Sequence, residues 1–439
     1  MKLTLNNVRG FEGNHTVTIR PITILLGENS SGKTTLLAAI SAVLNRDFPT
    51  TDNLFNRAPF ELGSFETIAT YRGGKYGRAA TFSVGWTDDN KQRPHSISAT
   101  FKSDSGTPRV DRVVVKNGPN ELTAQAGNDN FEFEFSYYGN EKTQRQKSSS
   151  GKPKVVKFKA VLGNLKAFRL QDTLRYFMLG DGHKLLRTSP KNADDMELFT
   201  ALSEFSYGGD SGLRPHATAL APLRTRPRRT YDELNEEFKP EGDHIPLVLA
   251  RLLSQQKKET SKELEALIRY GTASGLFEKI DVKRMGKQPS DPFQVRIKTK
   301  GPDANLVDVG YGVSQSLPIV IESIMAPENE VMLVQQPEVH LHPKAQAALG
   351  TFFVELAAST SKQFIIETHS DHLVDRVRLA IAEGAIPESK VQLIYLERKG
   401  LDIKVHEIGL DEVGNIIKAP STYRNFFLEE EIKLMSRAL

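Results

Sequence analysis

A glycine-rich segment near the start of the chain carries residue types that bind phosphate. Residues 27–34 read Gly-Glu-Asn-Ser-Ser-Gly-Lys-Thr, which fits the pattern G-x-x-x-x-G-K-[ST]. Glycines let such a loop aim its backbone N–H groups at phosphate oxygens, and the following helix adds the positive end of its dipole. Lys33 is expected to reach the β- and γ-phosphates, and the Thr34 hydroxyl to ligate Mg²⁺. The predicted nucleotide-binding residues of the loop are Asn29, Ser30, Ser31, Gly32, Lys33, Thr34 and Thr35.

The residues on either side have the pattern of the elements that must hold this loop. Pro21–Leu26 is a short, nearly continuous apolar run, which is typical of a strand buried on both faces. A helix is expected from Lys33 to Leu44. This strand–loop–helix context favours a phosphate site over a turn that merely contains Gly and Ser.

Further polar residues follow apolar strands near the other end of the chain. Strands are predicted at 331–334, 363–367 and 391–397, and helices at 315–324, 344–359 and 372–383. This alternation of strand and helix predicts a parallel sheet. The first strand leads into Gln335-Gln336-Pro337-Glu338, and the second ends at Glu367-Thr368-His369-Ser370. A glycine-rich turn, Gly310-Tyr311-Gly312-Val313-Ser314-Gln315, opens the first helix.

Together these motifs resemble the ABC-type ATPase heads of the SMC, RecF and OLD class. The closest likeness is to the small stand-alone AAA family ATPases of bacterial anti-phage systems. The resemblance covers residues 1–70, including Val8-Arg9-Gly10-Phe11, and residues 300–400, whereas 75–300 match loosely. It implies an α/β fold: a P-loop ABC-ATPase head with a mixed or parallel sheet core, an antiparallel β subdomain and a helical insertion.

The resemblance also implies roles for individual residues. Gly312, Ser314 and Gln315 would form the signature motif, which binds the γ-phosphate of ATP held by another subunit. His369 would be the switch histidine, and residues 340–343 would cross the dimer seam. The implied cofactors are ATP and Mg²⁺, and the implied assembly is a homodimer or a higher homo-oligomer.

The sequence departs from this class where two acids normally end the Walker B strand. Gln335 and Gln336 stand there, and an amide can hold a water but cannot take its proton at neutral pH. Three explanations stay open: Glu338 or Glu367 supplies the carboxylate, the protein is a slow ATP switch, or a glutamate was deliberately replaced. We favour slow turnover, with Gln336, Glu338 and His369 as catalytic residues and Glu338 as the substitute base. Thr34 and Gln335 are the predicted Mg²⁺ residues, and Gln335 would contact the ion through a water molecule.

Two other groups of residues suggest alternative sites. His340, His342, His369 and Asp371 could form a metal site, although the family resemblance accounts for them without metal. Basic residues crowd into 142–159 and 214–229, where they could contact nucleic acid or form a solvated face. The stiff segment Pro222–Pro227 favours an interface or nucleotide-proximal role for its arginines.

Composition narrows the class of protein. The chain has 439 residues, 38% hydrophobic and 26% charged, with a net charge of +4, which indicates a folded protein of several domains. Cysteine is absent, so disulfides and thiolate metal sites are excluded. The polar start Met1–Val8 and the lack of an apolar stretch of ~20 residues predict a cytoplasmic protein without membrane contact.

The predicted organisation has four parts. Residues 1–160 form an N-terminal ATPase lobe, with short alternating strands from 67 to 159 as an antiparallel meander. Residues 161–290 form a helical insertion or lid, with helices expected at 165–204 and 247–276. Residues 291–400 form the C-terminal ATPase lobe, and 401–439 form an extension.

The expected function is that of an ATP-binding, slowly hydrolysing ATPase that forms nucleotide-sandwich dimers. It would regulate or scaffold a separate effector, a nuclease or toxin, in anti-phage defence. One alternative is a RecF-like DNA-repair ATPase that binds duplex DNA. The other is a scaffold that binds ATP without hydrolysing it.

Overall fold

The computed structural model describes most of the chain apart from one long central segment. The described residues are 1–45, 47–49, 51, 53–74, 77–88, 95–127, 131–137, 154–160, 215–232, 237–254, 262–288 and 290–423. The helix predicted at 165–204, Arg214 and the lysines from 142 to 152 lie outside them. Within the described residues, no helix is long and apolar enough to span a bilayer.

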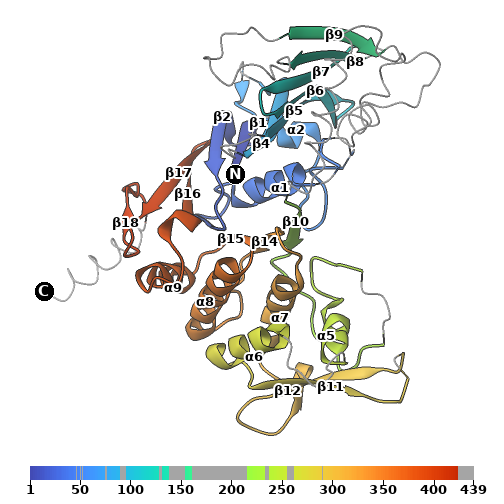
Figure 1. Cartoon of the computed structure of the whole chain (residues 1–439), viewed down its shortest axis with the longest axis vertical. Coiled ribbons are helices and arrows are strands. Elements are labelled where there is room, and N and C mark those ends of the chain that lie inside the picture. The colour runs from blue at the N-terminus through green and yellow to red at the C-terminus, as the bar shows by residue number, and fades with distance from the viewer. Residues whose placement is uncertain are drawn as a thin grey trace, which may run out of the picture.

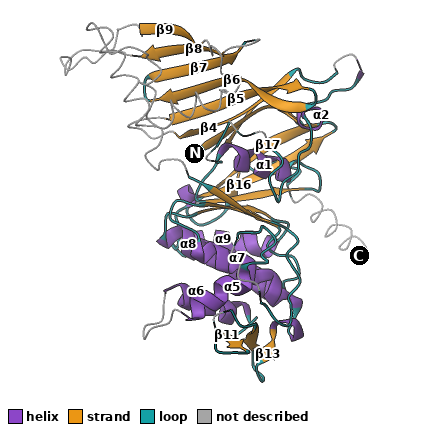
Figure 2. Ribbon diagram, turned by 90° about the vertical axis from the view of Figure 1, so that its right-hand side faces the viewer, coloured by secondary structure: helices purple, strands orange, loops and turns teal. Residues whose placement is uncertain are grey.

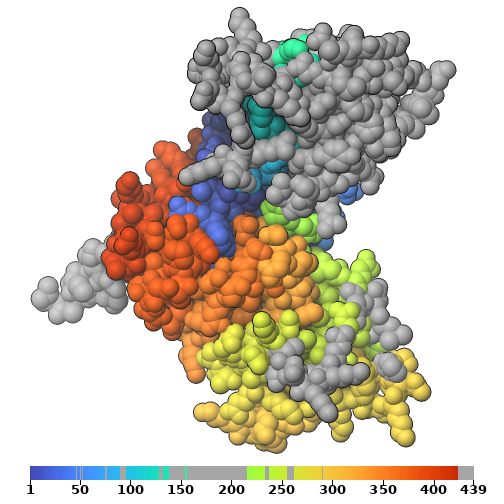
Figure 3. Space-filling view, viewed as in Figure 1, coloured from blue at the N-terminus to red at the C-terminus, as the bar shows by residue number. Residues whose placement is uncertain are grey.

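A seven-stranded sheet forms the centre of the molecule (Figure 1). In spatial order its strands are β10 (Ala217–Leu220), β14 (Val331–Gln335), β15 (Gln363–Glu367), β3 (Ile22–Gly27), β16 (Val391–Lys399), β17 (Asp402–Leu410) and β18 (Ile416–Ile417). The first five strands run parallel to one another. Strand β17 is antiparallel to β16, and β18 is antiparallel to β17. The predicted parallel sheet is therefore confirmed, and β3 from the N-terminus lies inside it. Blue N-terminal atoms accordingly lie directly against red and orange C-terminal atoms in Figure 3.

The central strands are apolar on both faces because the sheet has a separate core on each side. In β14, Val331 and Leu333 point into one core, while Met332 and Val334 point into the other. Alternation of this kind follows from the two-residue period of a strand. The nearly continuous apolar runs in the sequence are explained by this burial on both faces.

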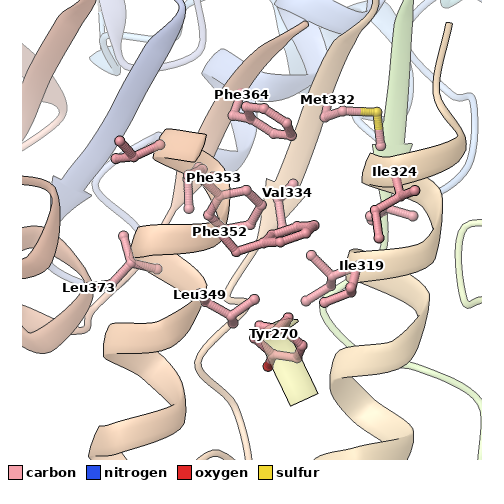
Figure 4. Packing of buried hydrophobic residues seen from close by; sticks show 14 of the residues in the cluster. Tyr270, Ile319, Ile324, Met332, Val334, Leu349, Phe352, Phe353, Phe364 and Leu373 are labelled. Carbon is pink, nitrogen blue, oxygen red and sulfur yellow. The ribbon is translucent and has the colours of Figure 1, made fainter. Parts of the chain in front are cut away.

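Helices cover both faces (Figures 1 and 2). The helices are α1 (Lys33–Val43), α2 (Phe65–Ile68), α5 (Ile245–Ser254), α6 (Lys262–Ser274), α7 (Tyr311–Met325), α8 (Pro343–Ser359) and α9 (Asp371–Ala382), with short 3-10 turns η3 (Leu306–Asp308) and η4 (Glu388–Lys390). Helix α1 packs on one face of the sheet, and α7, α8 and α9 pack on the other. On the second face, Phe353 of α8 lies against Phe364 of β15 with ring centroids 5.1 Å apart (Figure 4).

An eight-stranded antiparallel sheet covers the α1 side. Its spatial order is β2 (Phe11–Thr18), β1 (Lys2–Val8), β4 (Thr81–Asp88), β5 (His95–Asp104), β6 (Thr107–Asn117), β7 (Asn120–Ala126), β8 (Phe131–Tyr137) and β9 (Lys154–Ala160). The predicted meander is confirmed. A small sheet of β11 (Lys279–Arg284), β12 (Phe293–Lys298) and β13 (Ala304–Asn305) lies beyond α5 and α6 (Figure 2).

Two of the predicted domain boundaries separate strands that pair with each other in the central sheet. Strand β10 belongs to the predicted helical insertion 161–290, yet it pairs in parallel with β14. Strand β17 belongs to the predicted extension 401–439, yet it forms a hairpin with β16. The first pairing joins residues more than a hundred positions apart, so local pattern does not reveal it, whereas the second is a local hairpin that the boundary at 400 divides. The predicted helical stretch 247–276 contains α6 and most of α5, which begins at Ile245.

Candidate nucleotide-binding site

The phosphate-binding loop has the backbone that its glycines predict. It leaves β3 at Gly27 with φ 142° and enters α1 through Gly32 with φ 97°. A Cβ atom would overlap the carbonyl oxygen of Leu396 at the first position and the Ile403 side chain at the second. Only glycine meets both demands, positive φ and close approach, without strain.

Lys33 turns its amine back into this loop. Its Nζ donates to the carbonyl oxygens of Gly27, at 2.9 Å, and Glu28, at 2.8 Å. Burial lowers the pKa of Lys33, and the nearby carboxylates of Glu367 and Glu338 oppose that shift. A phosphate oxygen would be a stronger acceptor than these neutral carbonyls, because charge-assisted hydrogen bonds are the stronger ones. The amine is thus already positioned where an anion would bind.

An open pocket of about 620 Å³ lies in front of the loop. Its volume falls within the usual range of small-molecule sites, roughly 300–1,000 Å³. Six of the seven predicted loop residues line it: Asn29, Ser30, Gly32, Lys33, Thr34 and Thr35. Ser31 does not line it, because its side chain is buried behind the loop. Gln336 and Glu367 also line the pocket.

The ends of two neighbouring strands bring polar groups to the start of α1. Gln335 at the end of β14 pairs in register with Glu367 at the end of β15. Thr34 donates from Oγ1 to Oε2 of Glu367 at 3.3 Å. Burial raises the pKa of Glu367, and Lys33 and Thr34 oppose the shift. Hydroxyl and carboxylate oxygens are the ligands that Mg²⁺ prefers, so this pair of side chains fits that ion.

The two glutamines of β14 differ in their surroundings. Gln335 is 5% exposed, and its Nε2 has no hydrogen-bond partner within the described part of the chain. Gln336 has a φ of 42°, which is uncommon outside glycine, and its backbone N–H donates to the Glu367 carbonyl. This turn brings Gln336 to the wall of the loop pocket.

Glu338 lies beside His369, for which the resemblance implies the role of switch histidine. Its Oε1 accepts from the backbone N–H of His369 at 2.7 Å, and its Oε2 accepts from Thr368 Oγ1 at 2.8 Å. His369 itself is exposed, and burial of its ring on one side and the Lys33 charge lower its pKa. Glu338 therefore holds the backbone of the His369 loop, and it is not among the residues that line the loop pocket.

The predicted signature residues start α7 on the other face of the sheet. Ser314 and Gln315 are buried in the first turns, and Ser314 donates from Oγ to the Tyr311 carbonyl at 2.8 Å. Gly312 packs against the backbone of His340, and the Tyr311 ring meets the His340 ring edge-on. Among the described residues, no hydrogen bond joins this turn to the phosphate-binding loop.

The histidines proposed as metal ligands have other surroundings. His342 caps α8 by accepting from the Lys344 N–H, and His340 contacts Tyr311. In the part of the chain that the structure describes, no group of three or more histidine, aspartate or glutamate side chains is arranged to hold a metal ion.

Several arginines reach the site that were not among the predicted site residues. Arg9, whose motif was noted in the sequence, lines the pocket, as does Arg398, which donates to the Ser30 carbonyl. Arg224 is 5% exposed and donates to the backbone oxygen of Gln335 at 2.9 Å. Burial lowers its pKa to about 10. The proline-flanked arginine segment was the signal for Arg224, and the structure places this residue beside Gln335 at the end of β14.

Comparisons with known families match residues 2–374 of the chain to two related families. Residues 2–270 match the family described as AAA domain, and residues 226–374 match the family described as AAA ATPase domain. An OLD nuclease of Thermus scotoductus is 23% identical over 373 residues, which cover 81% of this chain. The chain spans 56% of the length of that relative.

Solved structures of SMC heads are similar over nearly the whole chain, although the superposition is loose. The SMC head bound to the C-winged helix domain of ScpA has a TM-score of 0.44 at 12% identity, with 94% of this chain and 98% of that chain covered. The SMC head domain from Thermotoga maritima has a TM-score of 0.40 at 11% identity, with 93% and 98% covered.

Proposed function

The chain belongs to the AAA domain family, and on that premise we propose that it binds ATP, hydrolyses it slowly, and uses it to join two heads. One observation carries the proposal: the pocket that Lys33, Thr34 and Glu367 line at the carboxyl edge of the central sheet. An ammonium group, a hydroxyl and a carboxylate lie together there at the N-terminus of α1, as binding of a nucleoside triphosphate with a divalent metal ion requires.

Each group has a role that its position supports. The backbone N–H groups of the loop and the start of α1 bind the phosphates, and Lys33 exchanges its carbonyl partners for the β- and γ-phosphate oxygens. Thr34 and Glu367 would hold Mg²⁺, and this ion would supply positive charge that neutralises the β- and γ-phosphates.

Slow hydrolysis is proposed because an amide faces the phosphate end of the pocket. Gln336 can orient a water molecule through its side-chain oxygen, but it cannot accept the proton of that water. General-base catalysis contributes a factor of roughly 10²–10⁴ in rate, and hydrolysis with glutamine at this position lacks that contribution. The ATP-bound state is therefore expected to be long-lived.

Dimerisation is proposed because the two phosphate-binding features lie on opposite faces of one sheet. Helix α1 belongs to the core on one face, and α7 belongs to the core on the other. The signature turn of one chain would therefore bind ATP that is held by the loop of a second chain. Two equivalent sites would give an isologous dimer, and ATP would favour it by mass action.

A separate effector is proposed as the target of this switch, most simply a nuclease or a toxin in an anti-phage system. The name of the relative supports the nuclease, since that protein is called an OLD nuclease. Because the match covers 56% of the relative, the pairing of this ATPase with a nuclease remains part of the proposal.

Light scattering after size-exclusion chromatography, combined with a turnover assay, tests the function. The full chain should be monomeric without nucleotide and dimeric or larger with ATP and Mg²⁺, and phosphate release should be slow. A chain that binds ATP and stays monomeric at every concentration would contradict the dimer.

The same assay separates a second candidate, the scaffold that never hydrolyses ATP. The uncharged pair Gln335 and Gln336 favours it. Phosphate release that equals the rate of a Lys33→Ala variant would establish the scaffold, and any higher rate would exclude it. A RecF-like role would require stimulation of turnover by duplex DNA.

A further inference from the structure

The carboxylate of the site lies on a different strand from the one that the family pattern indicates. Strand β15 lies between β14 and the loop strand β3. In register, Gln335 of β14 is opposite Glu367 of β15, and Glu367 is opposite Leu25 of β3. An acid at 367 is thus one strand closer to the phosphate-binding loop than an acid at 335 would be.

Glu367 has the contacts that a cation-holding carboxylate needs. Its Oε2 accepts from the hydroxyl of Thr34, it lines the loop pocket, and it is only 5% exposed. Neighbouring strands in a sheet are about 4.8 Å apart, so a shift of one strand keeps the carboxylate within reach of the same ion and its waters. One negative charge still lies at this edge of the sheet, beside an amide.

The amide of Gln335 supplies a second, independent observation. Its Nε2 is buried and has no hydrogen-bond partner within the described residues. Leaving a buried donor unpaired is unfavourable, so a partner is expected in the working state. A phosphate oxygen or a water bound to the cation would satisfy it, whereas an aspartate at 335 could not donate.

The competing carboxylate, Glu338, is already engaged. Both of its oxygens accept hydrogen bonds, one from the His369 backbone and one from the Thr368 hydroxyl. It is not among the residues that line the loop pocket. Glu338 is therefore suited to fix the position of His369 and not to hold a cation.

We propose that in this chain the acid and the amide have exchanged strands: Glu367 holds the divalent cation of bound nucleotide, Gln335 donates toward it, and Glu338 is a positioning residue for His369. This inference rests on the proposed function. It revises the expectation that Gln335 serves the cation through water and that Glu338 is the substitute carboxylate.

Calorimetry with the non-hydrolysable analogue AMP-PNP tests the exchange on the full chain. Binding is measured in Mg²⁺ and in EDTA, and the readout is the gain in affinity that Mg²⁺ produces. Glu367→Gln should lose ~10–100-fold of this gain, the usual cost of removing a metal-site partner, while its affinity in EDTA stays within about twofold. Binding of Mn²⁺, followed by electron paramagnetic resonance, should weaken in parallel.

A reciprocal variant makes the test specific. Gln335→Asp combined with Glu367→Gln returns the acid to β14 and should restore most of the gain, whereas Glu338→Gln should keep it. Circular dichroism shows whether each variant is folded. A full Mg²⁺ gain in Glu367→Gln, or its loss in Glu338→Gln, would overturn the exchange. Wild-type protein that binds AMP-PNP in neither buffer would overturn the proposed function, and this inference with it.

Discussion

The phosphate-binding loop and the signature turn each begin a helix at the same edge of the central sheet, yet they are built differently. At the loop, residues 28–30 are exposed, and the groups of Lys33, Thr34 and Glu367 face an open pocket. At the turn, Ser314 and Gln315 are buried, and the Ser314 hydroxyl is bonded to the Tyr311 carbonyl. At this end of α7, the N-cap Gly310 and the first residue Tyr311 are exposed.

This difference indicates that the loop and the turn have different roles within one head. The loop half holds every charged group that a triphosphate and its cation need, so it should bind nucleotide alone. The turn half offers a helix N-terminus and a hydroxyl, which suit a phosphate that another chain presents. Variants in the first half should therefore abolish nucleotide binding, and variants in the second half should abolish assembly alone.

The largest effect is expected at Lys33. Lys33→Ala removes the buried cation that faces the phosphates, and charge-assisted hydrogen bonds contribute about 1.5–3 kcal/mol each. ATP affinity measured by calorimetry should fall by ~100-fold or more. Lys300→Ala, which removes an exposed lysine far along the chain, is the control. Undiminished binding by Lys33→Ala would refute the assignment of the loop.

The next effect tests the pocket wall. Gln336→Glu places a proton acceptor where the amide now lies, with nearly the same shape, so phosphate release should rise by ~10²-fold or more. The lifetime of the ATP-bound dimer should shorten to match. The same substitution combined with Lys33→Ala should show no release, which controls for contaminating ATPases. An unchanged rate would mean that residue 336 does not face the attacking water.

A smaller effect is expected at the signature turn. Ser314→Ala removes one hydroxyl from each of the two sites in the proposed dimer. Loss of both hydroxyls should weaken ATP-dependent assembly by ~10-fold or more, as measured by light scattering. Nucleotide affinity of the single head should stay within about twofold. Ser316→Ala is a matched control, because its buried hydroxyl also bonds a carbonyl three residues back. Equal losses in both variants would indicate a purely structural effect.

The smallest effect concerns stability in the absence of nucleotide and Mg²⁺. Burial raises the pKa of Glu367 in the folded state, so this group favours folding most at pH below its unfolded pKa and loses that contribution as pH rises through its folded pKa. Glu367→Gln should therefore increase the free energy of unfolding at neutral pH, by about 1 kcal/mol.

Thermal melts in EDTA measure this gain, which should shrink as the pH is lowered toward 4. Glu383→Gln, at an exposed position, should show no such trend. A lower free energy of unfolding in Glu367→Gln at neutral pH would show that burial of the charged carboxylate does not destabilise the protein without nucleotide.

Much of the site could be predicted because its signals are local. The loop at 27–34, its strand and its helix lie within one stretch of chain, and the structure reproduces them. The strands that end at Gln335 and Glu367 were also predicted, as was the relation to AAA ATPases, which the family matches confirm. Dimerisation, the effector, the anti-phage role and the cytoplasmic location stay predictions.

Other residues could not be placed because their role depends on pairing across the fold. Nothing near Glu367 in the sequence shows that β15 lies between β14 and β3, so its contact with Thr34 was not foreseen. The two hydrogen bonds of Glu338 likewise depend on how the loop after β15 returns toward β14. Strand order is set by which apolar faces pack on which helices, over separations of hundreds of residues.

By itself, the sequence determined a loop with the pattern of a phosphate-binding loop, an alternation of buried strands and helices, and the presence of two amides where two acids are usual. Those features depend on residue type and on neighbours a few positions away. Only the tertiary structure decided which carboxylate contacts the loop, which arginine bonds to the end of β14, and that the helices after the loop and after the signature turn pack on opposite faces of one sheet. These are decided by the order and register of parallel strands, which bring distant residues within hydrogen-bond reach.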